Sequence, residues 1–500
     1  MNDPVLRWKE FQKQLEPLQT ARSILSWDLR TAAPKKAASR RVEVLSYFTS
    51  EIFRLQTSEE YLQILRDLEV PEVYATLDPA MKLTVDRSRK DAEAKARIPA
   101  DFYKELNRMR TQCERAWEEA KIRNDWEAFL PWLKKNIEMT AQYARYLYPE
   151  KEIYEALLSQ WVEGIDCAKV EQLFDEVRDG LVPLLRQIKE AGEPDLSMIP
   201  DHASIPELQK AEKILLSYMG LDMDGVLVCN GAHGLTGQMA PGDIRIINHY
   251  REDMPLDTLF TAIHEGGHAL YDQNVDPSLE GTAAARLIFS DLHESQSRFY
   301  ENILGRRASF WLPVYDQIKE VIPGFKNVSP EDLERAANHV IPSEVRTGAD
   351  DVTYCLHIIL RFQLEKELFR GVTPVEAARD RWNELMEEYL GVTPSDDTHG
   401  ILQDLHWSSV YFGYFPTYLL GSLYDGMFLE ALERDLGPVD ELLSQGRILE
   451  ITRWLKENIQ FKGSLENPGT VLQRVCGKEL SSEPLLAYFR EKYTRLYKLS

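Results

Sequence analysis

The sequence has little of what marks a secreted protein. Its 500 residues contain only five cysteines, an odd number with no metal-ligand spacing, namely Cys113, Cys167, Cys229, Cys355 and Cys476. We therefore expect free thiols in a reducing compartment. The first residues, MNDPVLRWKEFQKQ, carry charges throughout and contain no apolar core of a signal peptide. Together these absences predict a cytoplasmic protein.

Long apolar runs and excess positive charge are missing as well. A membrane span needs about 18 or more apolar residues, and the nearest candidate, residues 410–424, is short and interrupted by Pro416 and two glycines. The formal net charge of −22 would repel phosphate backbones. We therefore predict neither a membrane nor a nucleic acid as a partner.

The composition that remains is that of a largely helical globular protein. Hydrophobic residues make up 44% and charged residues 28% of the chain, which is typical of a soluble protein. Residues 56–70 place Tyr61, Ile64, Leu65 and Leu68 at the i, i+3, i+4, i+7 spacing of an amphipathic helix. Similar patterns recur along the chain without an internal repeat. The sequence therefore predicts a mainly α fold.

Residues 225–250, GVLVCNGAHGLTGQMAPGDIRIINHY, break the helical pattern. Glycines alternate here with two runs that favour β-structure, VLV and IRII, on either side of a loop. This pattern predicts a short hairpin or a small sheet. The segment directly precedes the strongest chemical motif of the chain.

That motif is HEGGH, residues 264–268. On a helix, His264 and His268 lie one turn apart on one face, so both imidazoles can reach a single ion. Neutral imidazole suits zinc, and cobalt can occupy the same ligands. Glu265 is rotated from the ligand face, close enough to accept a proton from a metal-activated water. In a chain with ten histidines a chance match is about a one-in-a-hundred event, and the alternative is a helix with two hydrogen-bonded histidines and an exposed glutamate.

The two glycines of the motif need an explanation of their own. Gly266 and Gly267 each cost a helix about 1 kcal/mol relative to alanine. They would allow a substrate or another chain segment to approach the helix closely. Packing against a neighbouring helix is an equally good explanation.

A catalytic zinc needs a third protein ligand and one open position. Residues 291–305, DLHESQSRFYENILG, predict a helix that contains Glu294. Glu294 would complete the common set of two histidines and one glutamate, whereas Asp291 and His293 are alternative ligands. The aspartate that follows this ligand by four residues in thermolysin-like sites is absent, because position 298 is Arg.

Two further segments combine polar and aromatic residues, VRTGADDVTYCLH at 345–357 and GILQDLHWSSVYFGYFPTY at 400–418. Arg346 has the planar, permanent charge that binds a carboxylate through two hydrogen bonds. Gln403, His406 and Tyr414 have donors suited to a peptide carbonyl or an oxyanion. The structural alternatives are a salt bridge from Arg346 to Asp350 or Asp351, and ordinary core packing of the aromatic residues.

Taken together, these segments resemble the Taq-type metallocarboxypeptidases, a family of helical zinc exopeptidases. HEGGHALYDQN is similar to the family's His-Glu-x-x-His helix, and HESQSRFYEN to its third-ligand helix. VRTGAD and GILQDLHW fit its Ile/Val-Arg-x-x-Ala-Asp and Gly-x-x-Gln-Asp-x-His-Trp motifs. FGYFPTY and the early segment SILSWDLRTAAPKKAASRR are similar to family segments too, so the resemblance spans nearly the whole chain.

The resemblance implies one catalytic domain over residues 1–500. We expect a large helical body of two lobes, divided by a deep substrate groove, with the metal at its floor and a small β-sheet beside it. It implies a zinc ion held by His264, His268 and Glu294, with Glu265 as general base. It also implies a homodimer that hydrolyses the C-terminal peptide bond of peptides with a free C-terminus.

Roles for the substrate side follow from the same resemblance. Arg346, assisted by Gln403, is expected to bind the terminal carboxylate. His406 or Tyr414 is expected to stabilise the oxyanion, and Tyr411 and Tyr418 are close competitors of Tyr414.

Some motifs depart from the family pattern. His233-Gly234-Leu235 stands where the family usually has His-Pro-Phe, and Asp243-Ile244-Arg245-Ile246-Ile247 lacks the threonine of Asp-x-Arg-x-Thr. Gly348 replaces a common glutamate and Val410 a common glycine. We expect His233, Asp243 and Arg245 along the substrate groove, with strand 243–247 pairing with an extended substrate. The departures therefore concern substrate preference, while the zinc set predicts an active member.

Two other functions compete with this interpretation. A metallo-oligopeptidase would cut internal bonds with the same zinc site. A non-catalytic peptide-binding scaffold would keep the zinc alone, but the intact Glu265 argues against it.

Overall fold

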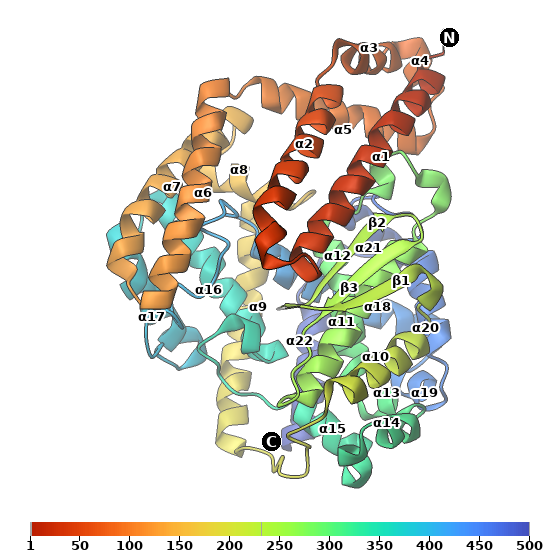
Figure 1. Cartoon of the computed structure of the whole chain (residues 1–500). Helices are drawn as coiled ribbons and strands as arrows, with labels where there is room; N and C mark the ends of the chain where they lie inside the picture. Colours follow the sequence, from red (N-terminus) through yellow and green to blue (C-terminus); the bar gives the residue numbers. More distant parts are fainter. Residues whose placement is uncertain (1–2, 232, 500) are drawn as a thin grey trace.

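Helices dominate the architecture of the computed structural model, which describes residues 3–231 and 233–499 (Figure 1). Within these residues, strands occur only in one small sheet, which lies beside the helix that carries the HEGGH motif. The predicted mainly α fold with a small sheet is confirmed. The groove between two lobes stays a prediction.

The long helices are distributed along the whole chain. The helices before the sheet are α1 (Pro4–Thr31), α2 (Ala38–Gln56), α3 (Glu59–Leu68), α4 (Pro71–Tyr74), α5 (Pro79–Ala96), α6 (Ala100–Arg123), α7 (Trp126–Leu147), α8 (Ile153–Leu158), α9 (Cys167–Ala191) and α10 (Ile205–Met219). Those after it are α11 (Pro255–Asn274), α12 (Ser290–Arg298), α13 (Ala308–Trp311), α14 (Tyr315–Val321), α15 (Pro330–Ala337), α16 (Asp351–Arg370), α17 (Ala378–Leu390), α18 (Pro416–Leu436), α19 (Val439–Ser444), α20 (Ile448–Leu455), α21 (Pro468–Cys476) and α22 (Glu483–Tyr497).

The sheet has three strands, β1 (Val226–Asn230), β2 (Leu235–Ala240) and β3 (Asp243–Asn248), in the order β1-β3-β2. Strand β3 pairs in parallel with β1 and antiparallel with β2. The tight turn between β2 and β3 uses Gly242 at a φ of +76°, a conformation that suits glycine. The two predicted β-runs are β1 and β3. The sequence did not predict β2, because LTGQMA has few β-branched residues.

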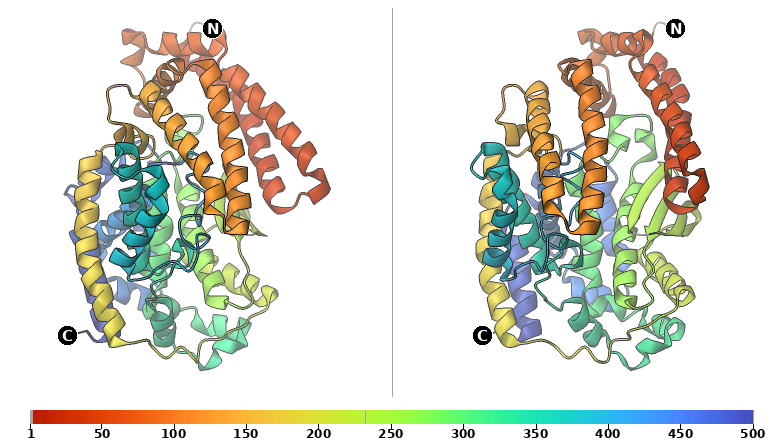
Figure 2. Two further views of the ribbon diagram at one scale, coloured as in Figure 1. Left: turned by 90° about the vertical axis from the view of Figure 1, so that its left-hand side faces the viewer. Right: turned by 60° about the vertical axis from the view of Figure 1, so that its left-hand side comes forward.

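The N-terminal helices have a hydrophobic core of their own. Trp8, Phe11 and Leu15 of α1 pack with Ile64, Leu65 and Leu68, three of the four residues in the predicted stripe of α3. The remaining helices share one large core. Figures 1 and 2 show α1 and α2 as a pair of helices that extends alongside the sheet. The predicted amphipathic helix of residues 56–70 is therefore confirmed as α3.

Two glycines let α11 pack tightly against the helices on either side of it. A Cβ atom on Gly267 would lie 2.7 Å from Cα of Ser297 in α12, and one on Gly266 would lie 2.6 Å from Cδ2 of Leu216 in α10. Real Cβ atoms do not approach other atoms so closely, so both positions require glycine or a shift of the neighbour. Helix packing is therefore the explanation that the structure supports. It brings α12, and with it Glu294, against the HEGGH helix.

No helix among residues 3–231 and 233–499 is long and apolar enough to cross a membrane. All five cysteines have free thiols.

Candidate active site

Three side chains from two adjacent helices converge on one point. His264 and His268 come from α11 and Glu294 comes from α12. Oε2 of Glu294 lies 4.0 Å from Nε2 of His264 and 3.5 Å from Nε2 of His268. Among the described residues this is the one group of three potential ligands whose donor atoms all lie within 4.8 Å of one another.

The donor set fits a single divalent metal ion. Ligand atoms at about 2.0–2.2 Å from a tetrahedral zinc are separated by roughly 3.4 Å, close to the distances to Glu294 given above. Two imidazoles and one carboxylate, with no sulfur, form the ligand set of catalytic rather than structural zinc sites. The residues present therefore fit the metal that the sequence predicts.

The alternative ligands are engaged elsewhere. Asp291 is buried and accepts hydrogen bonds from the hydroxyl of Tyr424 at 2.8 Å and from the backbone of Leu292. The ring of His293 stacks on His268 at 4.5 Å, and its Nε2 lies 3.1 Å from Oδ1 of Asp272. His293 therefore packs behind a candidate ligand, and Glu294 alone of the three faces both histidines.

The electrostatic potential at the three candidate ligands favours the binding of a cation. Burial raises the pKa of Glu294, but the hydrogen bond from His268 and the charge of His264 outweigh it and bring the pKa to about 2. Burial lowers the pKa of His268 to about 4, so its imidazole is neutral at pH 7. Burial also acts to lower the pKa of His264, yet Glu301, Glu294 and Glu265 raise it to about 9. The negative potential that favours a proton on His264 favours a metal ion equally.

Glu265 lies in a cradle that β2 forms. Only 5% of the residue is exposed, and Oγ1 of Thr236 donates a 2.6 Å hydrogen bond to its Oε2. Gly234 lies on its other side, since a Cβ there would come within 2.5 Å of Oε1 of Glu265. Burial raises the pKa of Glu265, which makes its carboxylate a stronger base. The alternative of an exposed glutamate is therefore wrong.

Arg346 is held in a buried cluster with a second arginine and one aspartate. Its Nε and Nη2 both donate to Oδ1 of Asp404, at 3.1 and 2.8 Å, while Arg361 donates to Oδ2 at 2.6 Å. The expected alternative, a bridge from Arg346 to Asp350 or Asp351, does not form, because Asp350 caps α16 and Asp351 pairs with Lys492. Two arginines share one carboxylate, so the cluster keeps one net positive charge.

Gln403 holds this cluster in place. Its Oε1 accepts hydrogen bonds from the backbone of Arg346 and from Nη2 of Arg361. Its Nε2 donates to the backbone carbonyls of residues 344, 399 and 400. Both N–H groups of its amide are therefore used within the protein.

His406 and Tyr414 lie in one aromatic cluster, with their ring centroids 5.7 Å apart. Burial lowers the pKa of His406 to about 4, so it is neutral at pH 7 and donates one N–H. Its Nε2 lies 3.3 Å from the hydroxyl of Tyr418. Burial, followed by the charge of Glu294, raises the pKa of Tyr414 to about 12, so its hydroxyl keeps its proton. Tyr411, in contrast, is 42% exposed.

The sequence did not indicate Tyr354, which lies between the Arg346 cluster and the candidate metal ligands. Its hydroxyl accepts a hydrogen bond from Nη1 of Arg346 at 3.2 Å. Its ring lies 4.4 Å from the guanidinium of Arg298, which is 3.9 Å from Glu294. A single tyrosine eight residues after Arg346 gives no pattern that singles it out.

Val410 has a strained backbone in the turn that carries His406. The backbone N–H of Tyr411 donates to the carbonyl of His406 and that of Val410 donates to the carbonyl of Trp407, the pattern of a Schellman motif. Val410 is at the position that favours glycine, and its φ is +68°. A β-branched residue is rarely found there. The glycine common in the resembling family thus has a structural reason, whereas Gly348 has a φ outside the left-handed region and room for a Cβ.

The residues expected along the substrate groove lie on and before the sheet. His233 is exposed, next to Gly234. Arg245 donates to Asp243 through Nε and Nη2 at 2.8 and 2.9 Å, so the two residues hold each other on β3. The prediction that β3 pairs with a substrate is wrong, because β1 and β2 already occupy both of its edges.

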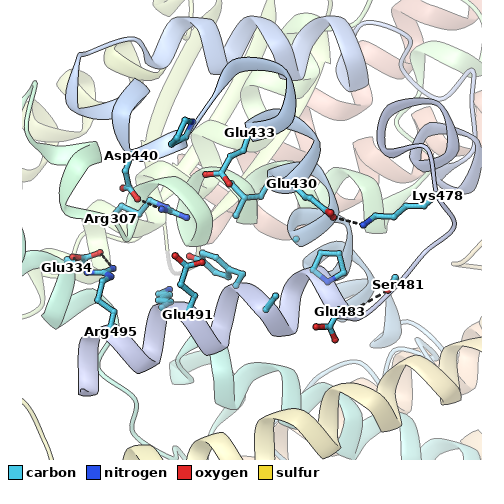
Figure 3. Close-up of a pocket in the computed structure, with 17 residues that line it drawn as sticks. Arg307, Glu334, Glu430, Glu433, Asp440, Lys478, Ser481, Glu483, Glu491 and Arg495 are labelled. Atoms are coloured by element: carbon cyan, nitrogen blue, oxygen red, sulfur yellow. Dashed lines mark hydrogen bonds and ion pairs between the residues drawn. The ribbon is translucent and has the colours of Figure 1, made fainter. Parts of the chain in front are cut away.

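Two cavities lie away from the convergent ligands. One of about 590 Å³ lies between α18 and α22, and six of its charged residues form the pairs Arg307–Asp440, Arg495–Glu334 and Lys478–Glu430 (Figure 3). A larger one, of about 1140 Å³, lies between α1 and the end of the sheet. Neither is lined by the three candidate metal ligands.

The HEGGH helix, the third carboxylate on α12 and the cradled Glu265 together define a metallopeptidase of the His-Glu-x-x-His class on a helical scaffold. Within that class the chain belongs to the carboxypeptidase Taq (M32) metallopeptidase family, whose sequence profile matches residues 7–493.

Named relatives cover almost the whole chain. Carboxypeptidase 1 of Bacillus subtilis is 35% identical over 489 residues, which are 97% of each chain. Thermostable carboxypeptidase 1 of Thermus thermophilus is 35% identical over 500 residues, 98% of each chain. The crystal structure of the M32 carboxypeptidase from Deinococcus radiodurans R1 matches with a TM-score of 0.94 at 30% identity, covering 99% of this chain and 100% of that one. The predicted family and enzyme class are confirmed.

Proposed function

We propose that this protein is a zinc-dependent metallocarboxypeptidase that removes the C-terminal residue of peptides. The observation that carries the proposal is the net positive cluster of Arg346, Arg361 and Asp404. Tyr354 and Arg298 connect this cluster to Glu294, one of the three candidate ligands. A fixed positive charge beside the metal centre selects a free carboxylate and disfavours internal chain segments. Family membership and the names of the relatives support the same activity.

His264, His268 and Glu294 would hold the metal, with zinc as the preferred ion and cobalt as a substitute that the same ligands accept. When bound, the ion supplies Lewis-acid polarisation of the attacking water and of the peptide carbonyl. The metal-facing Nε2 atoms of both histidines lie near Oε2 of Glu294.

Glu265 acts as the general base of the proposed reaction. Its carboxylate accepts a proton from the attacking water and passes it to the nitrogen of the leaving amino acid. The hydrogen bond from Thr236 keeps the carboxylate in one orientation. Because burial raises its pKa, the proton is held firmly enough to be carried between the two positions.

The neutral His406 and the protonated Tyr414 are the proposed hydrogen-bond donors to the carbonyl oxygen as it gains negative charge. Tyr418 shares this environment, because the charge of Glu294 contributes to raising its pKa too. We favour Tyr414 and Tyr418 over the exposed Tyr411.

Arg346 is the proposed partner of the C-terminal carboxylate. Asp404 takes its Nε and one N–H of Nη2, and Tyr354 takes one N–H of Nη1. One N–H on each terminal nitrogen is left for a substrate. Gln403 is a positioning residue for Arg346 in this proposal, rather than a direct substrate contact.

The remaining proposals concern the sheet, the domain organisation and the assembly. His233, beside the Glu265 cradle, is proposed to contact the substrate, whereas Asp243 and Arg245 maintain β3. We propose one catalytic domain over residues 1–500, with two lobes around a substrate groove. We also propose a homodimer located in the cytoplasm.

The deciding experiment compares a blocked dipeptide that has a free C-terminal acid with its C-terminal amide. Both are assayed with chelator and after zinc is added back. We expect cleavage of the acid only, loss of activity with chelator and recovery with zinc. Equal cleavage of acid and amide would favour the oligopeptidase alternative. A metal-replete protein that is inert on a broad dipeptide panel, and unchanged by Glu265→Gln, would favour the non-catalytic scaffold.

A further inference from the structure

The candidate metal centre has an outer carboxylate, Glu301, which lies near the end of the HESQSRFYEN segment. Oε2 of Glu301 lies 2.9 Å from Nδ1 of His264. The other ring nitrogen of His264, Nε2, lies 4.0 Å from Glu294. One imidazole is thus held between two carboxylates, which lie seven residues apart in one continuous helical segment, about two turns from each other.

The helix changes its geometry between these two glutamates. Helix α12 runs directly into a π-helical turn, Phe299–Gly305, and the backbone N–H of Arg306 donates to the carbonyl of Glu301 at 3.1 Å, five residues back. Such turns are rare and occur frequently at functional sites. Gly305 ends this one against α11, since a Cβ there would lie 3.3 Å from Cδ1 of Ile263, the neighbour of His264.

Arg306 fixes the carboxylate from the other side. Its Nη2 donates to Oε1 of Glu301 at 2.8 Å, and its Nη1 donates to the carbonyl of Ala337 at 2.6 Å. The side chains of Glu301 and Arg306 are 17% and 14% exposed. Each carboxylate oxygen therefore has one partner, and neither is free to rotate toward solvent.

We propose that Glu301 is a positioning residue of the metal centre, which holds His264 as the tautomer with its proton on Nδ1 and thereby directs the Nε2 lone pair to the metal. A carboxylate partner on the distal nitrogen orients a metal-binding imidazole and increases its basicity. The π-turn and Arg306 set the position of that carboxylate.

The two histidines differ in this respect. Within the described part of the chain, Nδ1 of His268 is buried without a hydrogen-bond partner, and the ring is held by stacking on His293. Glu301 is therefore the carboxylate that orients a candidate ligand of this site. Among the described residues, His268 has no comparable carboxylate partner that could compensate for the loss of Glu301.

The test measures the affinity of the full-length protein for Zn²⁺ by competition with a chromophoric chelator. Variants Glu301→Ala and Glu301→Gln are compared with the wild type. The matched control is Glu334→Gln, since Glu334 is a buried carboxylate that Arg495 binds at 3.0 and 2.7 Å away from the site. We expect about a 10- to 100-fold loss of affinity for Glu301→Ala. Glu301→Gln, which keeps a hydrogen-bond acceptor but loses the charge, should fall near the lower end, and the control within about twofold of the wild type.

A second readout covers the case in which Glu301→Ala does not fold. The visible absorption bands of Co²⁺ report the arrangement of its ligands, so Glu301→Gln loaded with Co²⁺ should show shifted bands. Wild-type zinc affinity and unchanged cobalt bands in the folded Glu301→Gln protein would overturn the proposal. The inference depends on the proposed metal centre but not on the peptidase reaction. Weaker zinc binding in the Glu301 variants bears on this inference, whereas absence of activity in the wild type bears on the proposed function. The two results can therefore be told apart.

Discussion

The two halves of the candidate site are built in different ways. On the metal side, the three candidate ligands and the outer carboxylate lie within residues 264–301, on α11, α12 and the π-helical turn that continues α12. On the substrate side, Arg346, Arg361 and Asp404 come from three separate segments and meet in a buried cluster. The first half is assembled by local helix geometry, whereas the second depends on contacts over long sequence distances.

This difference indicates where each half is vulnerable. The metal side needs only that α11 and α12 remain packed, which Gly267 allows. The substrate side depends on Gln403, whose amide connects the backbone of residues 344, 399 and 400 with both arginines. We therefore expect the metal side to tolerate damage elsewhere in the molecule better than the substrate side does.

The largest expected effect separates chemistry from metal binding on the metal side. Glu265→Gln removes the proposed base but keeps the side chain's shape, so kcat should fall by about 10²- to 10⁴-fold. Zinc content, measured by atomic absorption, should stay near that of the wild type. Retained activity would show that Glu265 is not the base.

The next effect tests the substrate side alone. Arg346→Gln leaves Asp404 paired with Arg361 only, and kcat/KM for a free-acid dipeptide should fall about 100-fold, the effect of truncating one partner of a buried charge pair. Zinc affinity should not change. Arg495→Gln, which breaks an ion pair outside the site, is the control and should keep full activity. An equal loss in both variants would point to a general loss of stability.

A smaller effect is expected from a substitution that disrupts the packing of α11 against α12. Gly267→Ala forces a Cβ against the backbone of α12, and overpacking of this kind costs about 1–3 kcal/mol. Denaturant unfolding of the metal-free protein and zinc affinity should both decrease. Gly469→Ala in α21, where the nearest atom would be 3.5 Å away, is the matched control. A Gly267→Ala protein with unchanged stability would contradict the packing explanation.

The smallest expected effect is an increase in stability. Val410→Gly relieves a left-handed backbone at a position that suits glycine, so the free energy of unfolding should rise by about 1 kcal/mol. Chemical denaturation monitored by circular dichroism measures the change. Because His406 lies in the same turn, an unchanged kcat would show that the strain has no catalytic role. A loss of stability would mean that packing of the valine outweighs the strain.

The sequence predicted the metal side better than the substrate side, and the reason is physical. His264 and His268 follow helical spacing, which a sequence displays directly, and Glu294 lies in a segment that resembles a family motif. Thr236 and Glu301 were missed because a weak β-strand and a π-turn leave little periodic signal. The bridge expected from Arg346 to Asp350 or Asp351 was wrong, because a nearby charge in sequence is not necessarily the nearest in space. Asp404, 58 residues away from Arg346 along the chain, takes that place.

The separate core of the N-terminal helices has a practical consequence for handling this protein. We expect helices α1 to α5 to unfold as a unit, because Trp8, Phe11 and Leu15 pack with other residues of these helices in a core separate from the large one. We expect molecules in which α1 to α5 have unfolded to keep all three candidate metal ligands but to lose the helices beside β2. The zinc-to-protein ratio of an aged sample would then overstate its active fraction. Turnover per bound zinc is the better measure of quality.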